Sequence, residues 1–122
     1  MKLSRLRGRK ICDYVLRKGQ AWKGKTMTIR FLMGPPPHPS VDPSARAIYV
    51  GTLASTRLDK SAVKRNRMRR RCREALRTVL REYQNLPTTQ LLLVPHSSSL
   101  SAPFADIQND IRSFLSRVSH GS

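Results

Sequence analysis

Residues 60–76 read KSAVKRNRMRRRCREAL, and seven of the ten positions from Lys64 to Arg73 are lysine or arginine. Like charges at i, i+3 and i+4 spacing weaken a helix, and within this stretch only Glu74 offsets them. Phosphates would neutralise these charges, and the release of their counterions would add salt-dependent affinity. The stretch therefore predicts a surface that binds a polyanion.

An apolar stripe begins in the same stretch and predicts a long helix over residues 61–83. Because this stripe must face the core, the arginines of the same turns project outward. The turn before it carries no stripe, so all of Lys64–Arg67 can be exposed. Asn66 in this turn could donate to and accept from a 2′-hydroxyl, a base edge or a phosphate-bound water, although exposed asparagines are common. The stripe consists of Met68, Cys72, Ala75, Leu76, Val79, Leu80 and Tyr83.

The composition of the chain narrows the class of protein. A length of 122 residues with 39% apolar residues indicates one globular domain. The net charge is +17, and 22 of the 24 basic residues precede Glu82, which indicates a localised binding surface. No run approaches the ~20 apolar residues of a membrane span, and no apolar signal region follows the first basic residues. We therefore expect a cytosolic protein, and both nucleic acid and an anionic membrane surface remain possible as its polyanion.

The remaining pattern gives the order helix, strand, strand, helix, strand, helix, in one domain over residues 1–122. In the first strand, Met27, Ile29, Phe31 and Met33 alternate with Thr28, Arg30 and Leu32, so one face is predicted to enter the core. In chain order, the segments around the long helix are a basic arm (1–8), a helix (9–18) capped by Gly19, the first strand (26–33), an exposed hairpin loop with five prolines (34–44), a strand (46–54) with a bulge or close approach at Gly51, a buried strand (86–95), a helix opened by Ser101 and Pro103, and a tail (119–122).

Candidates for chemistry within the chain are few. The acidic residues are scattered and form no carboxylate pair or histidine-bearing triad, so either the protein only binds or its partner performs the chemistry. Cys12 and Cys72 are expected to be buried thiols, since neither they nor the histidines show paired metal-ligand spacing. Trp22 and Tyr49 either stack on bases or belong to the core and its rim.

The sequence SAVKRNRMRRRCREALR resembles the signature helix of the bacterial ribonuclease P protein subunit. That helix carries an Ala-Val pair, then Arg-Asn-Arg, further basic residues and Arg-Glu. RLRGRK, YVGTLAS and QLLLVP are similar to the arm and two strands of the family, and the resemblance covers about residues 5–118. The matching positions are Ala62-Val63, Arg65-Asn66-Arg67, Arg69-Arg70-Arg71 and Arg73-Glu74.

The resemblance implies an α/β (α+β) two-layer sandwich with a left-handed β-α-β crossover. It also implies a protein that assists a catalytic RNA in cutting the 5′ leader from precursor tRNA, and that is inactive alone. Mg²⁺ would be bound mainly by the RNA, with no metal, small-molecule substrate or catalytic residue on the protein. The residues expected to face the catalytic RNA are Lys60, Lys64, Arg65, Asn66, Arg67, Arg69, Arg70, Arg71 and Arg73.

A groove between the first helix and the sheet would hold the leader, and here the chain departs from the family. Cys12 and Leu16 stand where many members have aromatic residues, and Arg30 replaces an aromatic on the first strand. Thr56-Arg57 replaces the usual Lys-Lys after the second strand. Leader binding would then depend more on charge and on the planar guanidinium of Arg30. The expected groove residues are Cys12, Leu16, Arg30, Tyr49 and Arg57.

Two other classes of protein fit the charge. A ribosomal protein or an RNA chaperone would also neutralise folded RNA, and composition does not separate these from the ribonuclease P subunit. The Arg-Asn-Arg signature favours the subunit, and co-purification with a large RNA that cleaves precursor tRNA would decide. A membrane-surface helix fits less well, because the charges of 60–76 lie beside a stripe suited to a protein core.

Overall fold

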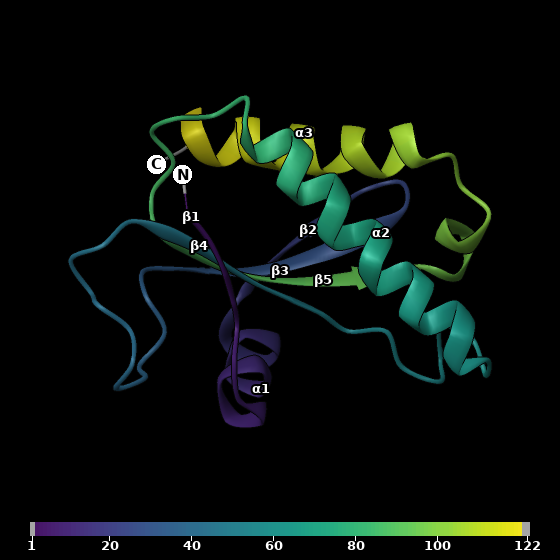
Figure 1. The fold of residues 1–122 in the computed structure, drawn as a ribbon, viewed down its shortest axis with the longest axis horizontal. Coiled ribbons are helices and arrows are strands. Elements are labelled where there is room, and N and C mark those ends of the chain that lie inside the picture. The colour runs from purple at the N-terminus through teal and green to yellow at the C-terminus, as the bar shows by residue number, and fades with distance from the viewer. Residues whose placement is uncertain (1, 121–122) are drawn as a thin grey trace.

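The computed structural model describes residues 2–120, which form one sheet and three α-helices (Figure 1). Each predicted helix is present, and the first has the predicted bounds. The elements are β1 (Lys2–Arg5), α1 (Arg9–Lys18), β2 (Gln20–Lys23), β3 (Met27–Met33), β4 (Ala47–Thr52), α2 (Ala62–Leu80), β5 (Thr89–Pro95), a 3-10 turn (Ser97–Leu100) and α3 (Phe104–His120).

The sheet is mixed, with the strand order β1-β4-β5-β3-β2. Strands β1 and β5 run parallel to β4, whereas β3 is antiparallel to β5 and β2 is antiparallel to β3. Adjacent parallel strands cannot be joined by a tight turn, and α2 connects β4 to β5 as a β-α-β unit. The α+β class implied by the resemblance is confirmed.

Helices cover both faces of the sheet. Figure 1 shows α1 below the sheet, and α2 and α3 side by side above it. The chain therefore has a helix layer on each face, one layer more than the two-layer arrangement implied by the resemblance. None of the helices among residues 2–120 is both long and apolar enough to span a membrane.

The larger core lies between the sheet and the α2–α3 layer. The predicted stripe of α2 is buried from Met68 to Leu80, while Tyr83 lies beyond the helix end and is half-buried. The Tyr83 hydroxyl donates to the carbonyl of Arg112 on α3 at 3.1 Å, which ties the two helices together. Burying each large apolar side chain stabilises the fold by about 1.5–3 kcal/mol, so this stripe fixes the orientation of α2.

Strand β3 has the two faces that its alternation predicts. Ile29 is fully buried and Phe31 packs on Phe114 of α3, with ring centroids 5.0 Å apart. Arg30 points to the opposite face and donates to the main-chain carbonyl of Leu16 on α1. Met33, at the strand end, is 49% exposed, so the expected apolar face is shorter than predicted.

A smaller core lies under α1, where Val15 packs with Tyr49 and Leu92. Gly19 ends α1 with its N–H donating to the carbonyl of Val15 at 2.8 Å, as expected of a cap. Its backbone is extended rather than left-handed, and a Cβ there would lie 2.8 Å from the carbonyl oxygen of Phe31. Glycine is needed here for close approach, not for a positive φ.

The prediction that residues 34–44 form a hairpin loop is wrong. Strand β5 lies between β3 and β4, so the two strands that this segment connects do not pair. Only Pro36 in it is buried, and its remaining residues are exposed or half-buried. Sequence order could not reveal the insertion, because β5 arrives from more than thirty residues later.

Both edge strands were missed. Lys2–Arg5, expected only as a basic arm, pairs with β4 as β1, and Gln20–Lys23 pairs with β3 as β2. Each has four residues, too few to show a clear alternation.

At Gly51 the ladder continues without a bulge, and a Cβ would touch the Leu92 side chain at 3.4 Å. Helix α3 runs through His120, so only residues 121–122 of the expected tail remain, outside the described residues.

Candidate nucleic-acid interface

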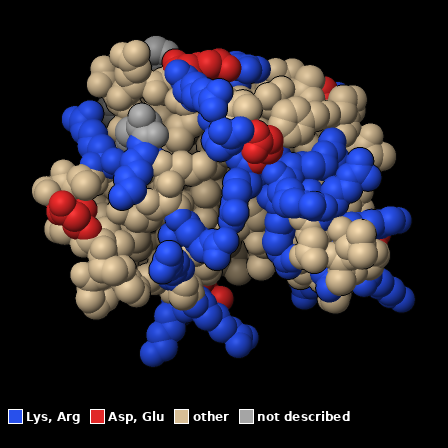
Figure 2. All heavy atoms as spheres, viewed as in Figure 1, with Lys and Arg blue, Asp and Glu red and all other residues tan. Residues whose placement is uncertain are grey.

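The seven lysines and arginines from Lys64 to Arg73, here called the basic stretch, lie in the first three turns of α2. Ser61 caps this helix by accepting the Lys64 N–H at 3.3 Å, and Asp59 accepts the Ser61 N–H at 2.7 Å. The first turn holds no acidic residue, so its cations face the positive end of the helix dipole without compensation. This arrangement costs stability in the isolated protein and favours an anionic partner. Figure 2 shows lysine and arginine side chains gathered over the region of α2.

Three arginines of this stretch are anchored to main-chain carbonyls outside α2, and we call them the anchored set: Arg65, Arg69 and Arg71. Arg65 donates to Asp59 and Lys60 at 3.0 and 2.8 Å. Arg69 reaches Ala54 at 2.8 Å, and Arg71 reaches Ser99 at 3.1 Å and also Ala102. The three guanidiniums hold the segments before α2 and after β5 against the helix.

The other cations of the stretch form the unanchored set: Lys64, Arg67, Arg70 and Arg73. All four are exposed, and their side chains make no hydrogen bond or ion pair with residues 2–120. They border two hollows of about 200 and 460 Å³, one on each side of the helix. These groups keep all their donors for a ligand, which suits phosphate oxygens.

Asn66 lies between the two sets and is exposed. Its side-chain oxygen accepts a hydrogen bond from Arg69, which also holds the Ala54 carbonyl. The asparagine thus orients an arginine while its own N–H₂ group stays available. Val63 was not among the residues expected to contact RNA. It is 75% exposed beside Asn66, so it can pack on a sugar or base. Its only sequence signal is its place within the family signature.

Acidic side chains pair with groups outside the basic stretch, so the surface of this part of α2 stays positive. Glu74 pairs with Arg77 beyond the basic stretch, and that hydrogen bond lowers the pKa of Glu74. Glu82 pairs with Arg112, and Asp110 accepts the backbone N–H groups of Lys25 and Thr26. Among residues 2–120, no three His, Cys, Asp or Glu side chains form a group that could hold a metal ion.

The expected leader residues fall into three places. Leu16, which is 39% exposed, and Arg30 lie together where α1 meets β3, whereas Cys12 packs against the smaller core that includes Tyr49. The Arg30 Nε is buried without a hydrogen-bond partner among the described residues. Tyr49 is buried under α1 and borders a separate hollow of about 560 Å³ between β1 and the 34–44 segment. Arg57 is exposed in the loop after β4.

That hollow holds basic residues that the sequence reasoning did not assign. Lys2, Arg5 and Arg7 line it from the β1 side and His38 from the proline-rich segment. Only the parallel pairing of β1 with β4 brings them together, and the one signal in the sequence was the charge of the arm. Trp22, the other aromatic considered for stacking, lies on the opposite sheet face, beside α3.

Neither thiol is poised for chemistry. Burial raises the pKa of Cys72 to about 12, and it also raises the pKa of Cys12, with a smaller contribution from Asp13. Both cysteines are free, and they lie on helices at opposite faces of the sheet. A thiol whose pKa is raised carries little thiolate at neutral pH, so both serve packing.

The fold and the surface agree with comparisons to known proteins. A protein-family model described as Ribonuclease P matches residues 1–119. The ribonuclease P protein component of Thermus oshimai is 32% identical over 102 residues, which cover 84% of this chain and 56% of that one. The one from Synechococcus sp. (strain RCC307) is 38% identical over 96 residues, or 73% and 71% of the two chains. The chain thus spans little more than half the length of the first relative.

Solved structures share the fold. The RNase P protein from Thermotoga maritima superposes with a TM-score of 0.73 over 94% of this chain and 97% of that one, at 15% identity. At that identity the likeness concerns the fold alone. The family model covers nearly the whole chain, including the Arg-Asn-Arg helix, and the chain therefore belongs to the ribonuclease P protein family.

Proposed function

We propose that this protein is the protein subunit of ribonuclease P, which binds a catalytic RNA and precursor tRNA during removal of the 5′ leader. The observation that carries the proposal is the unanchored set: four exposed cations whose side chains have no partner among residues 2–120, on a helix that belongs to the family signature. Neutralising phosphates with these groups releases counterions and brings two polyanions, the catalytic RNA and its substrate, into contact.

The nine residues expected to face the catalytic RNA divide their work. Lys60 and the unanchored set contact phosphates directly, and Asn66 offers its N–H₂ group to a sugar or base edge. The anchored set adds charge within a Debye length of the RNA, about 8 Å at physiological salt, but spends donors on carbonyls. We propose that these arginines mainly hold the surface in shape.

The leader is proposed to pass over the junction of α1 and β3. Arg30 already donates to the Leu16 carbonyl there, which fixes its guanidinium plane beside Leu16. A fixed plane can stack on a base while its charge attracts phosphate. Tyr49 and Arg57 lie apart from this junction, so we place them at the two ends of the leader path.

We further propose that the RNA performs the chemistry with Mg²⁺ bound mainly to itself, in the cytoplasm, and that the protein alone is inactive. Charge screening is work that Mg²⁺ otherwise does, so the protein should lower the Mg²⁺ requirement of its RNA. The test is cleavage of precursor tRNA by the cognate RNA across a Mg²⁺ series, with and without protein. The proposal would be refuted if RNA-free protein cleaved at the mature 5′ end, or if the Mg²⁺ requirement of the RNA did not change. An unchanged requirement would favour a ribosomal protein or an RNA chaperone.

The leader assignment has its own test. Arg30→Ala should weaken binding of precursor tRNA to the holoenzyme and leave mature tRNA unaffected, because only the precursor carries a leader. The measured quantity is the ratio of the two affinities. Arg81→Ala, an exposed change at the end of α2 on the other face of the sheet, is the matched control. An unchanged ratio in Arg30→Ala would make this arginine a strut between α1 and β3 only.

A further inference from the structure

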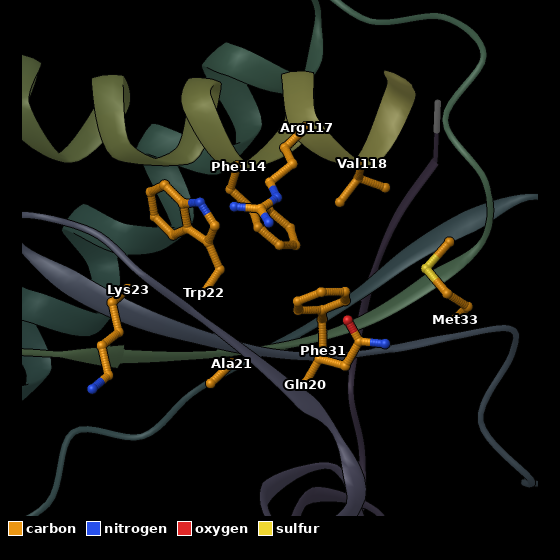
Figure 3. A pocket seen from close by; sticks show the side chains of 9 residues that line it. All are labelled: Gln20, Ala21, Trp22, Lys23, Phe31, Met33, Phe114, Arg117 and Val118. Atoms are coloured by element: carbon orange, nitrogen blue, oxygen red, sulfur yellow. The ribbon is translucent and has the colours of Figure 1, made fainter. Parts of the chain in front are cut away.

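A hollow of about 480 Å³ opens between the edge strand β2 and the C-terminal half of α3 (Figure 3). It lies on the sheet face away from α1, and its lining includes no residue of the basic stretch on α2. The proposed function uses none of its side chains. Its volume is within the roughly 300–1,000 Å³ of small-ligand sites.

Three aromatic rings form its apolar wall. Phe114 is buried and meets Trp22 and Phe31 edge to face, with centroid distances of 5.8 and 5.0 Å and interplanar angles of 62° and 68°. Such edge contacts hold the two outer rings in fixed orientations. Trp22 and Phe31 are only half-buried, so part of each ring stays open to the hollow. Fixed, partly open rings suit a planar ligand.

The charged residues that line the hollow, Lys23 and Arg117, are both basic. Both are exposed, and neither is paired with a carboxylate of residues 2–120. Figure 3 shows the Arg117 guanidinium reaching from α3 toward the rings and Gln20 beside Phe31, whereas the Lys23 side chain points away from the rings. A ligand here should therefore combine a planar apolar group with a negative charge.

We infer that the hollow binds one unstacked nucleotide of single-stranded RNA. The base lies against Trp22 and Phe31, the phosphate meets Arg117, and the Gln20 amide pairs with the base edge. Within the described part of the chain, strand β2 pairs only with β3, so the backbone groups of its outer edge can also reach the base. The RNA source rests on the proposed function, since RNA is the polyanion that this protein is proposed to meet. An acidic peptide would satisfy the charges but leave the fixed planes unused.

The chain offers its own probe, because Trp22 is its single tryptophan. The full-length protein is titrated with single-stranded triadenylate, AMP, inorganic phosphate and an acidic peptide (tetraglutamate) while Trp22 fluorescence is followed. We expect saturable quenching by triadenylate, at least tenfold weaker binding of AMP, and none with phosphate. No quenching by triadenylate overturns the inference, equal affinity for AMP overturns the RNA source, and quenching by an acidic peptide but not by triadenylate assigns the hollow to a protein partner.

Two exposed positions provide variants with little risk to folding. Arg117→Gln should weaken triadenylate binding about tenfold or more, through loss of a charge-assisted hydrogen bond. Arg81→Gln removes the same charge from an exposed position outside the hollow and should leave quenching unchanged. Equal quenching in Arg117→Gln and in the parent protein would overturn the inference.

A shift of the Trp22 indole N–H signal in NMR is the second readout. If quenching fails while the parent protein still lowers the Mg²⁺ requirement of the RNA, only this inference fails. If quenching holds and reconstitution fails, the proposed function fails and the nucleotide site remains.

Discussion

The anchored and unanchored sets of α2 contain the same kind of side chain in the same ten residues, yet their surroundings differ. Guanidiniums of the anchored set are bonded to main-chain carbonyls of neighbouring segments, whereas the unanchored set has no protein partner among the described residues. A charge count treats the two sets alike. The structure separates cations that hold the protein together from cations that remain available to a ligand.

The largest effect is expected from the unanchored set. Changing Lys64, Arg67, Arg70 and Arg73 together to Gln should lower affinity for the catalytic RNA about a thousandfold, or ~4 kcal/mol, at ~1 kcal/mol per contact. The slope of log K against log salt should fall by about 3–4. Thermal stability should hold or rise, since like charges are removed. Filter binding over a salt series measures both, and an unchanged slope would contradict direct phosphate contacts.

The anchored set should show the reverse. Arg71→Ala removes the donors that satisfy the carbonyls of Ser99 and Ala102, and it should destabilise the fold by about 2–3 kcal/mol. Arg70→Ala, one residue earlier and exposed, is the matched control and should change stability by less than about 0.5 kcal/mol. Urea unfolding measures both variants. Equal stability of the two would remove the distinction between the sets.

The buried side of the same helix gives a pH-dependent test. Burial raises the pKa of Cys72 to about 12 from its ordinary 9.0, although the Arg71 charge acts to lower it. Above pH 9 the thiol ionises in the unfolded chain but stays neutral in the folded one. Stability should therefore fall by about 1.4 kcal/mol per pH unit between pH 9 and 12.

Cys72→Ala should lose this component of the pH dependence, although its stability at neutral pH is lower. The measurement is urea unfolding of both proteins at pH 8, 9 and 10. Parallel pH profiles for the two would show that other groups cause the loss of stability.

The contrast between the sets also shows which features of the structure could be predicted from the sequence. The stripe of α2, the bounds of α1 and the two faces of β3 follow from local periodicity, so they could be predicted. The partners of Arg71 come from a turn 28 or more residues later, and no local pattern records them. The same holds for β5, whose insertion between β3 and β4 depends on the whole topology. The signature located the basic surface but not which of its cations are occupied.

The smallest effect, and the sharpest for this comparison, concerns Asn66. Asn66→Ala removes the acceptor that orients Arg69, and we expect about fivefold weaker RNA binding, or ~1 kcal/mol, with stability changed by less than about 0.5 kcal/mol. A double-mutant cycle with Arg69→Gln separates two explanations. If Asn66 acts only by holding Arg69, it should have no further effect once Arg69 is changed. If its N–H₂ group contacts the RNA, the two losses should add. Additivity would support the proposed contact of Asn66 with the RNA, whereas full coupling would make Asn66 only a part of the anchoring network that extends to Ala54.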